Sequence, residues 1–261
     1  MRSLGWMVTA STLILAIASS VRHGLLQSNA WDLGIFDQPL YLLSQGLPPI
    51  STIINIHILG DHAAWIFYPL SVLYRLVPAV HWLLAVQAIA LAVGAIPTWY
   101  LAQQAGLKQA QANAMAAVYL LYPLIFNLNL FDFHPEVIAL PLMLTAIYMA
   151  RAKRILWFSV CVVVALGCRD ALSLTIAAMG IWLWWFEQRR VCGAIAFGAG
   201  VVWFLVATQV IIPHYQPLGI PGASHYREFG NSIPEILLNI VLRPDILVRS
   251  LFTWPNLGYL C

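Results

Sequence analysis

Charged residues are scarce in this chain of 261 residues, where Asp, Glu, Lys and Arg together make up 9%. Soluble domains carry about 25% charged residues. A sequence that is 61% hydrophobic is also too apolar to be hidden in one soluble core of this length. The net charge of +3 is small, and no basic cluster indicates a nucleic-acid partner. The composition therefore excludes an ordinary soluble domain and favours the lipid bilayer as solvent.

Cysteine is also rare and carries no pattern. The four cysteines lack the spacing of metal ligands, and three of them lie in or beside apolar runs: Cys161, Cys168, Cys192 and Cys261. We interpret them as small hydrophobic residues. No paired aspartates lie within the apolar runs and no zinc motif is present, which argues against an intramembrane protease.

The sequence consists mainly of long apolar runs, such as Ile155–Gly167 and Val191–Ile212. Backbone that faces lipid has to satisfy its own hydrogen bonds, so only helices and closed barrels span membranes. A barrel would show short strands of alternating polarity, and these runs do not alternate. The sequence predicts an all-α, polytopic transmembrane bundle formed by a single membrane domain over residues 1–261.

Eight apolar stretches are candidates for spans, which need about 20 apolar residues each: Leu4–Val21, Ala63–Val80, Trp82–Ala102, Ala112–Asn127, Val137–Ala150, Ile155–Gly167, Ala171–Phe186 and Val191–Ile212. A weaker amphipathic stretch follows at Ile233–Phe252. The first stretch is interpreted as an uncleaved signal anchor, with a cleaved signal peptide as the alternative, because Ala18-Ser19-Ser20 offers small residues.

The positions of the basic loops indicate that seven of the eight stretches cross the membrane. Short loops rich in Lys and Arg are cytoplasmic, and the basic loops fall on one side only if Ala63–Val80, which contains Pro69, Arg75 and Pro78, lies at the interface. The predicted cytoplasmic residues are Arg2, Lys108, Arg151, Lys153, Arg154, Arg189 and Arg190. The other face, of a plasma membrane, then receives nearly all acids and many histidines: Asp32, Asp37, Asp61, His62, Asp132, His134, Glu136, Asp170, His214, His225 and Glu228.

The first external loop offers two groups of candidate residues. Asp32 and Asp37, in Trp31–Gln38, suit a general base or a metal ligand at the membrane surface, and they equally suit helix capping. Asp61-His62 suits metal binding or a proton relay, with an N-cap as the alternative. A divalent cation is a possible cofactor on this evidence, and the sequence leaves the metal unassigned.

The densest polar segment is Phe131-Asp132-Phe133-His134-Pro135-Glu136. In an extended chain its three ionisable groups point to one side, and Pro135 disfavours helix at His134. Such a row can hold a divalent cation or polarise a hydroxyl. The alternative is a polar turn with an acid at the start of the next helix, where the helix dipole favours it.

Arg169-Asp170 joins two apolar runs without a spacer, where charges are costly and are usually functional or mutually paired. Arg169 is a candidate for binding a phosphate. Arg22, Arg227 and Arg243 are further candidates, and Arg227 lies in a loop rich in Pro and Gly that suits a mobile lid.

Three of these segments together resemble the DUF2079 family of predicted membrane proteins: Trp31–Gln38, Gly60-Asp61-His62, and Phe131–Glu136 followed by Val137–Pro141. That family looks related to the GT-C membrane glycosyltransferases. The resemblance implies a GT-C-like fold with interfacial helices, a polyprenyl-phosphate sugar donor in the membrane lipid, an external active site and an acidic residue in the first external loop. Asp32, Asp37, Asp132, His134 and Glu136 are then the catalytic candidates, and Asp61, His62, Arg169, Asp170 and Arg227 the substrate-binding candidates.

The chain departs from the family pattern at two places. Members often have Phe-Ser-Pro after Gly-Asp-His, where this chain has Ala63-Ala64-Trp65, and Lys-Glu-Asp-Leu where it has Cys168-Arg-Asp-Ala171. Members are usually longer, so we expect a fragment, a truncated product or a degenerate relative. The alternatives to a glycosyltransferase are a transporter or lipid flippase, and a non-catalytic membrane subunit.

Overall fold

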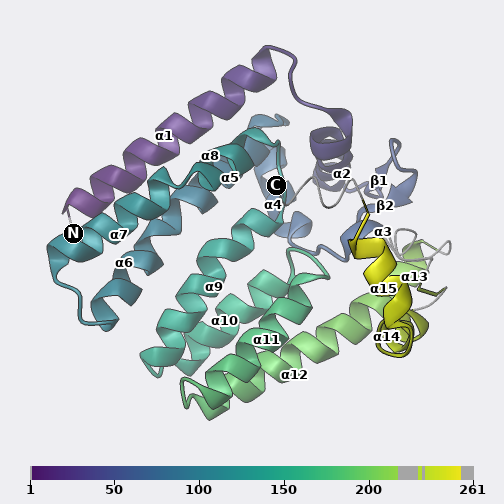
Figure 1. Cartoon of the computed structure of the whole chain (residues 1–261). Coiled ribbons are helices and arrows are strands. Elements are labelled where there is room, and N and C mark those ends of the chain that lie inside the picture. Colours follow the sequence, from purple (N-terminus) through teal and green to yellow (C-terminus); the bar gives the residue numbers. More distant parts are fainter. Residues whose placement is uncertain (1, 217–228, 231–232, 254–261) are drawn as a thin grey trace. The chain divides into compact units, whose positions relative to one another are not determined.

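The structure is a computed structural model that describes residues 2–216, 229–230 and 233–253. The chain divides into two compact units, residues 1–216 and residues 217–261, and each is considered by itself. The expected single membrane domain stays a prediction. Most described residues are helical, as the sequence predicted, and Figure 1 shows the helices in sequence colours.

In the described part of the chain, four helical segments are long and apolar enough to cross a membrane. They are α1 (Arg2–Gly24), α5 with α6 (His81–Val93 and Ala95–Gln104), α7 with α8 (Gln109–Leu121 and Pro123–Leu130), and α12 with η2 and α13 (Arg190–Val206, Ala207–Ile211 and Ile212–Tyr215). At 1.5 Å per residue, 22 residues extend for about 33 Å, which matches the ~30 Å hydrocarbon layer. The chain is therefore a polytopic helical membrane protein.

Three further helices of the first unit are shorter. They are α9 (Glu136–Arg151, 16 residues), α10 (Ile155–Leu166, 12 residues) and α11 (Leu172–Trp185, 14 residues). Their lengths of about 24, 18 and 21 Å fall below the ~30 Å hydrocarbon layer. Four of the seven expected spans thus have full length, and the crossing of the other three stays a prediction.

The helices of this unit place their connections at two ends. At one end, the Asn113 side chain donates to Ser3, Gln104 donates to the Tyr148 carbonyl, and Arg189 donates to the Arg151 carbonyl. We call this the basic end, because it carries Arg2, Lys108, Arg151, Lys153, Arg154, Arg189 and Arg190. The opposite end, called the acidic end, carries residues 22–62, 131–136 and 167–170. The predicted separation of basic and acidic residues is present in the fold.

Glycine lets α11 and α12 approach closely, side by side in Figure 1. A Cβ on Gly180 would lie 2.7 Å from the Gly193 carbonyl oxygen, and one on Gly193 would lie 2.8 Å from the Gly180 carbonyl oxygen. Small residues serve this purpose in membrane helices. A Cβ on Gly200 would likewise lie 2.5 Å from the Ser173 carbonyl oxygen, whereas a Cβ on Gly198 would meet nothing within 4 Å.

Between α1 and α5 the chain forms short elements: η1 (Ala30–Gly34), α2 (Ile35–Ser44), a two-residue hairpin of β1 (Ile50–Ser51) and β2 (Ile56–His57), α3 (Ile58–His62) and α4 (Phe67–Leu76). Stacking of Phe36 on Phe67, with ring centroids 5.0 Å apart, joins α2 to α4. With ten residues, or about 15 Å, α4 is too short to cross a membrane. This agrees with the interfacial place predicted for Ala63–Val80; the hairpin was not predicted.

The second unit contains α14 (Ile233–Leu242) and α15 (Pro244–Leu251). The predicted amphipathic stretch Ile233–Phe252 is therefore two helices, separated at Arg243. The break has a local cause, because Pro244 disfavours helical conformation in the residue before it. Within this unit the Asn239 side chain donates to the Phe229 carbonyl oxygen at 2.6 Å.

Candidate functional site

Asp132 is the most deeply buried carboxylate of the acidic end, with 2% of its surface exposed. Arg22, near the end of α1, donates from Nη1 to Oδ1 at 2.6 Å, and the Asn29 backbone amide donates to Oδ2 at 3.0 Å. The backbone of Asp132 is left-handed, with φ +68°, a conformation that Asp tolerates better than most residues. Both carboxylate oxygens of Asp132 are thus engaged in binding the first loop to the segment after α8.

The buried side-chain amide of Gln87 holds the same segment in place. Gln87 of α5 donates from Nε2 to the carbonyls of Leu128, Asn129 and Asp132, at 3.1, 3.1 and 2.6 Å, and its Oε1 accepts from the His134 amide at 3.0 Å. Sequence reasoning missed Gln87. The available signal was an amide side chain within an apolar run, because such a side chain needs a hydrogen-bond partner inside a membrane.

Asp32 and His134 form the most accessible acid–imidazole pair of this end. The His134 Nε2 lies 3.9 Å from Asp32 Oδ1, and each side chain is about a quarter exposed, at 27% and 25%. Asn29 donates from its side chain to the other oxygen of Asp32. The His134 ring stacks on Phe131, with centroids 5.2 Å apart. The pair is therefore oriented by neighbours and still open to a substrate.

Asp37 lies apart from that pair. Its Oδ1 accepts a hydrogen bond from the Tyr74 hydroxyl at 2.7 Å. Burial, and the hydrogen bond to Asp37, raise the pKa of Tyr74 well above its usual value, so the tyrosine stays a donor. This contact joins α2 to α4 and gives Asp37 a positioning role in the loop.

A second cluster surrounds His62. Its Nδ1 lies 3.3 Å from Asp170 Oδ1 and its Nε2 lies 3.6 Å from Asp61 Oδ1. The Asp170 backbone amide also donates to the His62 carbonyl at 3.0 Å. Burial raises the pKa of Asp61, and the charges of His62 and Arg169 oppose that rise. The imidazole therefore lies between two carboxylates, as a proton relay requires.

Arg169 forms an ion pair with Glu136, the first residue of α9. Its guanidinium engages Glu136 Oε1, while Oε2 is buried without a hydrogen bond among the described atoms. The side chain of Arg169 is still 35% exposed. Of the two alternatives for Arg169-Asp170, mutual pairing is not what the structure contains, because Arg169 pairs with Glu136 and Asp170 faces His62.

The structure thus gathers nine of the ten predicted site residues at one end, in two clusters and one separate contact. The first cluster contains Asp32, Asp132 and His134, and the second contains Asp61, His62, Glu136, Arg169 and Asp170. Arg227 lies outside the described residues, as do His225 and Glu228. Across residues 2–216, 229–230 and 233–253, no group of three acid, histidine or cysteine side chains is placed to hold a metal ion.

The fold and this site define a polytopic helical membrane protein with its ionisable side chains collected at one end of the helices. The family profile described as "Predicted membrane protein (DUF2079)" matches residues 22–261. The chain belongs to this family, as its three sequence segments indicated. Neither the curated proteins nor the solved structures contain a match to it.

Proposed function

We propose that this protein is a GT-C-like membrane glycosyltransferase that takes sugar from a polyprenyl-phosphate carrier at the extracytoplasmic face. The observation that carries the proposal is the partly exposed pair of Asp32 and His134 beside the buried Asp132. A glycosyl transfer of this kind needs a base for the acceptor hydroxyl and positive charge for the phosphate that leaves. Both chemical types are present at the acidic end.

Among the acids of the first cluster and the nearby Asp37 of the same loop, Asp32 fits the role of base best. Asp132 is committed to Arg22 and Asn29, and Asp37 accepts from Tyr74. Asp32 keeps a 25% exposed carboxylate within 3.9 Å of an imidazole. His134 can take up or pass on the acceptor's proton, because an imidazole ring can serve as a general base or a general acid.

Arg169 is the cation that we assign to the phosphate of the donor. It is more exposed than Arg22, whose guanidinium is engaged by the buried Asp132. A planar guanidinium with five donors matches phosphate oxygens while it retains one contact to Glu136. In this assignment Asp61, His62 and Asp170 hold the segment that carries Arg169.

The test is sugar transfer from a polyprenyl-phosphate donor in proteoliposomes. Asp32→Asn is expected to lower the rate by at least about 100-fold, the usual contribution of a general base, with unchanged melting temperature. Asp37→Asn is the matched control: it makes the same chemical change five residues away and is expected to reduce the rate far less. Wild-type transfer by Asp32→Asn rejects the assignment.

The same proteoliposomes separate transfer from transport. A transporter places ionisable groups near the midplane, often on broken helices, whereas the acids here lie at helix ends. Donor-dependent uptake without transfer would replace the glycosyltransferase proposal by the transporter alternative.

A further inference from the structure

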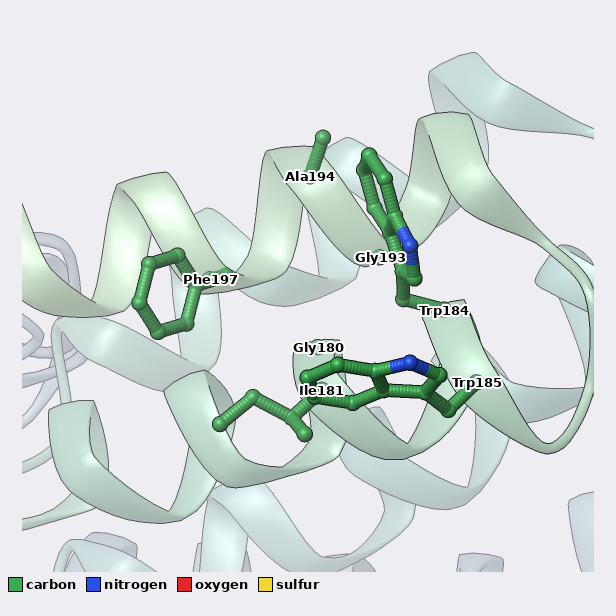
Figure 2. A pocket seen from close by; sticks show the side chains of 7 residues that line it. All are labelled: Gly180, Ile181, Trp184, Trp185, Gly193, Ala194 and Phe197. Carbon is green, nitrogen blue, oxygen red and sulfur yellow. The ribbon is translucent and has the colours of Figure 1, made fainter.

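A groove runs between α11 and α12 towards the basic end, away from the acidic clusters. Its volume is about 490 Å³, and apolar side chains line it: Gly180, Ile181, Trp184, Trp185, Gly193, Ala194 and Phe197. Figure 2 shows the Trp185 ring along α11, the Trp184 ring rising from α11 towards Gly193, and Ala194 and Phe197 on α12. This volume lies in the range of small-ligand sites.

Glycine creates the groove. Where Gly180 faces Gly193 the two helices are too close for a Cβ on either, so no side chain fills the space beside them. The large side chains flank the opening and remain exposed: Trp184 at 43%, Trp185 at 67% and Phe197 at 46%. A surface of this kind on a membrane helix is shaped for a flexible apolar chain.

A cation stands on the same helix face at the end of the groove. Arg190 begins α12, and positions 190, 194 and 197 share one face because they are four and seven residues apart. Arg190 is exposed, and within the described part of the chain it makes no ion pair. Arg189 beside it is engaged with the Arg151 carbonyl. Arg190 is therefore the charge that a ligand in the groove meets.

From this juxtaposition we infer that the groove is a binding site for an anionic glycerophospholipid. The phosphate binds Arg190 at the membrane surface, and one acyl chain lies along Gly193, Ala194 and Phe197 between the two tryptophan rings. Three features support this occupant: a positive charge at the surface end, an apolar groove below it, and tryptophans at the level of lipid headgroups. The site is separate from the proposed glycosyltransferase site and does not depend on it.

The experiment measures lipid binding to the full chain in detergent by native mass spectrometry, with phosphatidylglycerol and phosphatidylcholine of equal chain length. Arg190→Gln is expected to weaken phosphatidylglycerol binding about fivefold, the effect of one basic residue near a charged lipid surface, and to leave phosphatidylcholine unchanged. Ala194→Trp, which fills the groove from an exposed position, is expected to weaken both lipids.

Lys108→Gln is the matched control, since it removes one exposed positive charge at the same end from a different helix. Near-UV circular dichroism and melting temperature confirm that each variant is folded. Equal affinity of the wild type for both lipids overturns the inference. So does an Arg190→Gln effect no larger than that of Lys108→Gln, or an Ala194→Trp variant that binds like the wild type.

Discussion

The two ends of the first unit use charge in opposite ways. At the basic end one pair is complete: Arg151 donates to both oxygens of Glu187, at 2.8 and 2.6 Å, while its guanidinium lies 6.0 Å from the Trp182 ring. At the acidic end Arg22 pairs with Asp132 just as closely, at 2.6 Å, but the histidine contacts are longer, with His62 at 3.3 and 3.6 Å from two acids and His134 at 3.9 Å from Asp32. The histidines of the acidic end are therefore held less tightly than the Arg151–Glu187 pair of the basic end.

The balance of charge differs as well. The acidic end carries six carboxylates: Asp32, Asp37, Asp61, Asp132, Glu136 and Asp170. Among the described residues, two arginines form ion pairs with them, Arg22 with Asp132 and Arg169 with Glu136. Excess carboxylate near lipid is costly unless something binds it or protons are shared. The acidic end thus carries more carboxylates than arginine partners, and this excess is what the proposed catalytic role would use.

The largest expected effect on stability comes from Arg22. Arg22→Ala leaves the buried Asp132 without its ionic partner, and breaking such a pair costs about 3 kcal/mol or more. Thermal unfolding in detergent measures this loss. The double variant Arg22→Ala/Asp132→Asn is expected to recover part of it, while Arg75→Ala, an exposed arginine of α4, is the control. A single variant no less stable than that control would contradict the role of Asp132 as an anchor.

The close packing of α11 against α12 can be tested by replacing glycines. Gly180→Ala forces a Cβ against the α12 backbone and is expected to cost about 1–3 kcal/mol of unfolding free energy, as overpacking does. Gly198→Ala is the matched substitution on α12, where a Cβ meets nothing within 4 Å, so it should be neutral or slightly stabilising. Equal melting temperatures for the two variants would mean that α11 and α12 are farther apart at Gly180 than the structure places them.

The Arg151–Glu187 pair gives the basic end an acid sensitivity. The hydrogen bonds from Arg151 hold the pKa of Glu187 below its usual value, so the pair stabilises the fold above the unfolded pKa and is lost as pH falls through the folded pKa. Because both side chains are partly exposed, the contribution is expected to be about 0.5–1 kcal/mol. Melting temperatures of Glu187→Gln and wild type should differ at pH 7 and converge as the pH falls below the folded pKa of Glu187.

Asp61 is expected to show the reverse dependence, with the smallest effect. Burial raises its pKa, so the stability associated with the neutral acid is present below the unfolded pKa and declines as pH rises through the folded pKa. Asp61→Asn should remove that decline and melt slightly higher than wild type at pH 7. A variant that melts lower at pH 7 and equally at pH 3 would show that ionised Asp61 stabilises the His62 cluster.

Much of this organisation followed from the sequence because hydropathy and basic loops are local signals. The long helices, the failure of residues 67–76 to form a full-length span and the gathering of acids at one end were all predicted. Pairing was not predictable, because it depends on contacts between residues far apart in the sequence. Arg22 meets Asp132, 110 residues away, and Arg169 meets Glu136, 33 residues away, instead of its neighbour Asp170. Gln87 was overlooked for the same reason, since its partners lie 41 to 47 residues away.

The short helix α10 has a consequence for the surrounding lipid. Its 12 residues extend for about 18 Å, so for α10 to cross, the adjacent bilayer has to become thinner by about 12 Å, or the polar turns at both of its ends have to be drawn inward. Headgroups of the nearby outer leaflet would then descend towards Arg169, three residues beyond the last turn. A lipid-borne phosphate could reach that guanidinium without leaving its leaflet.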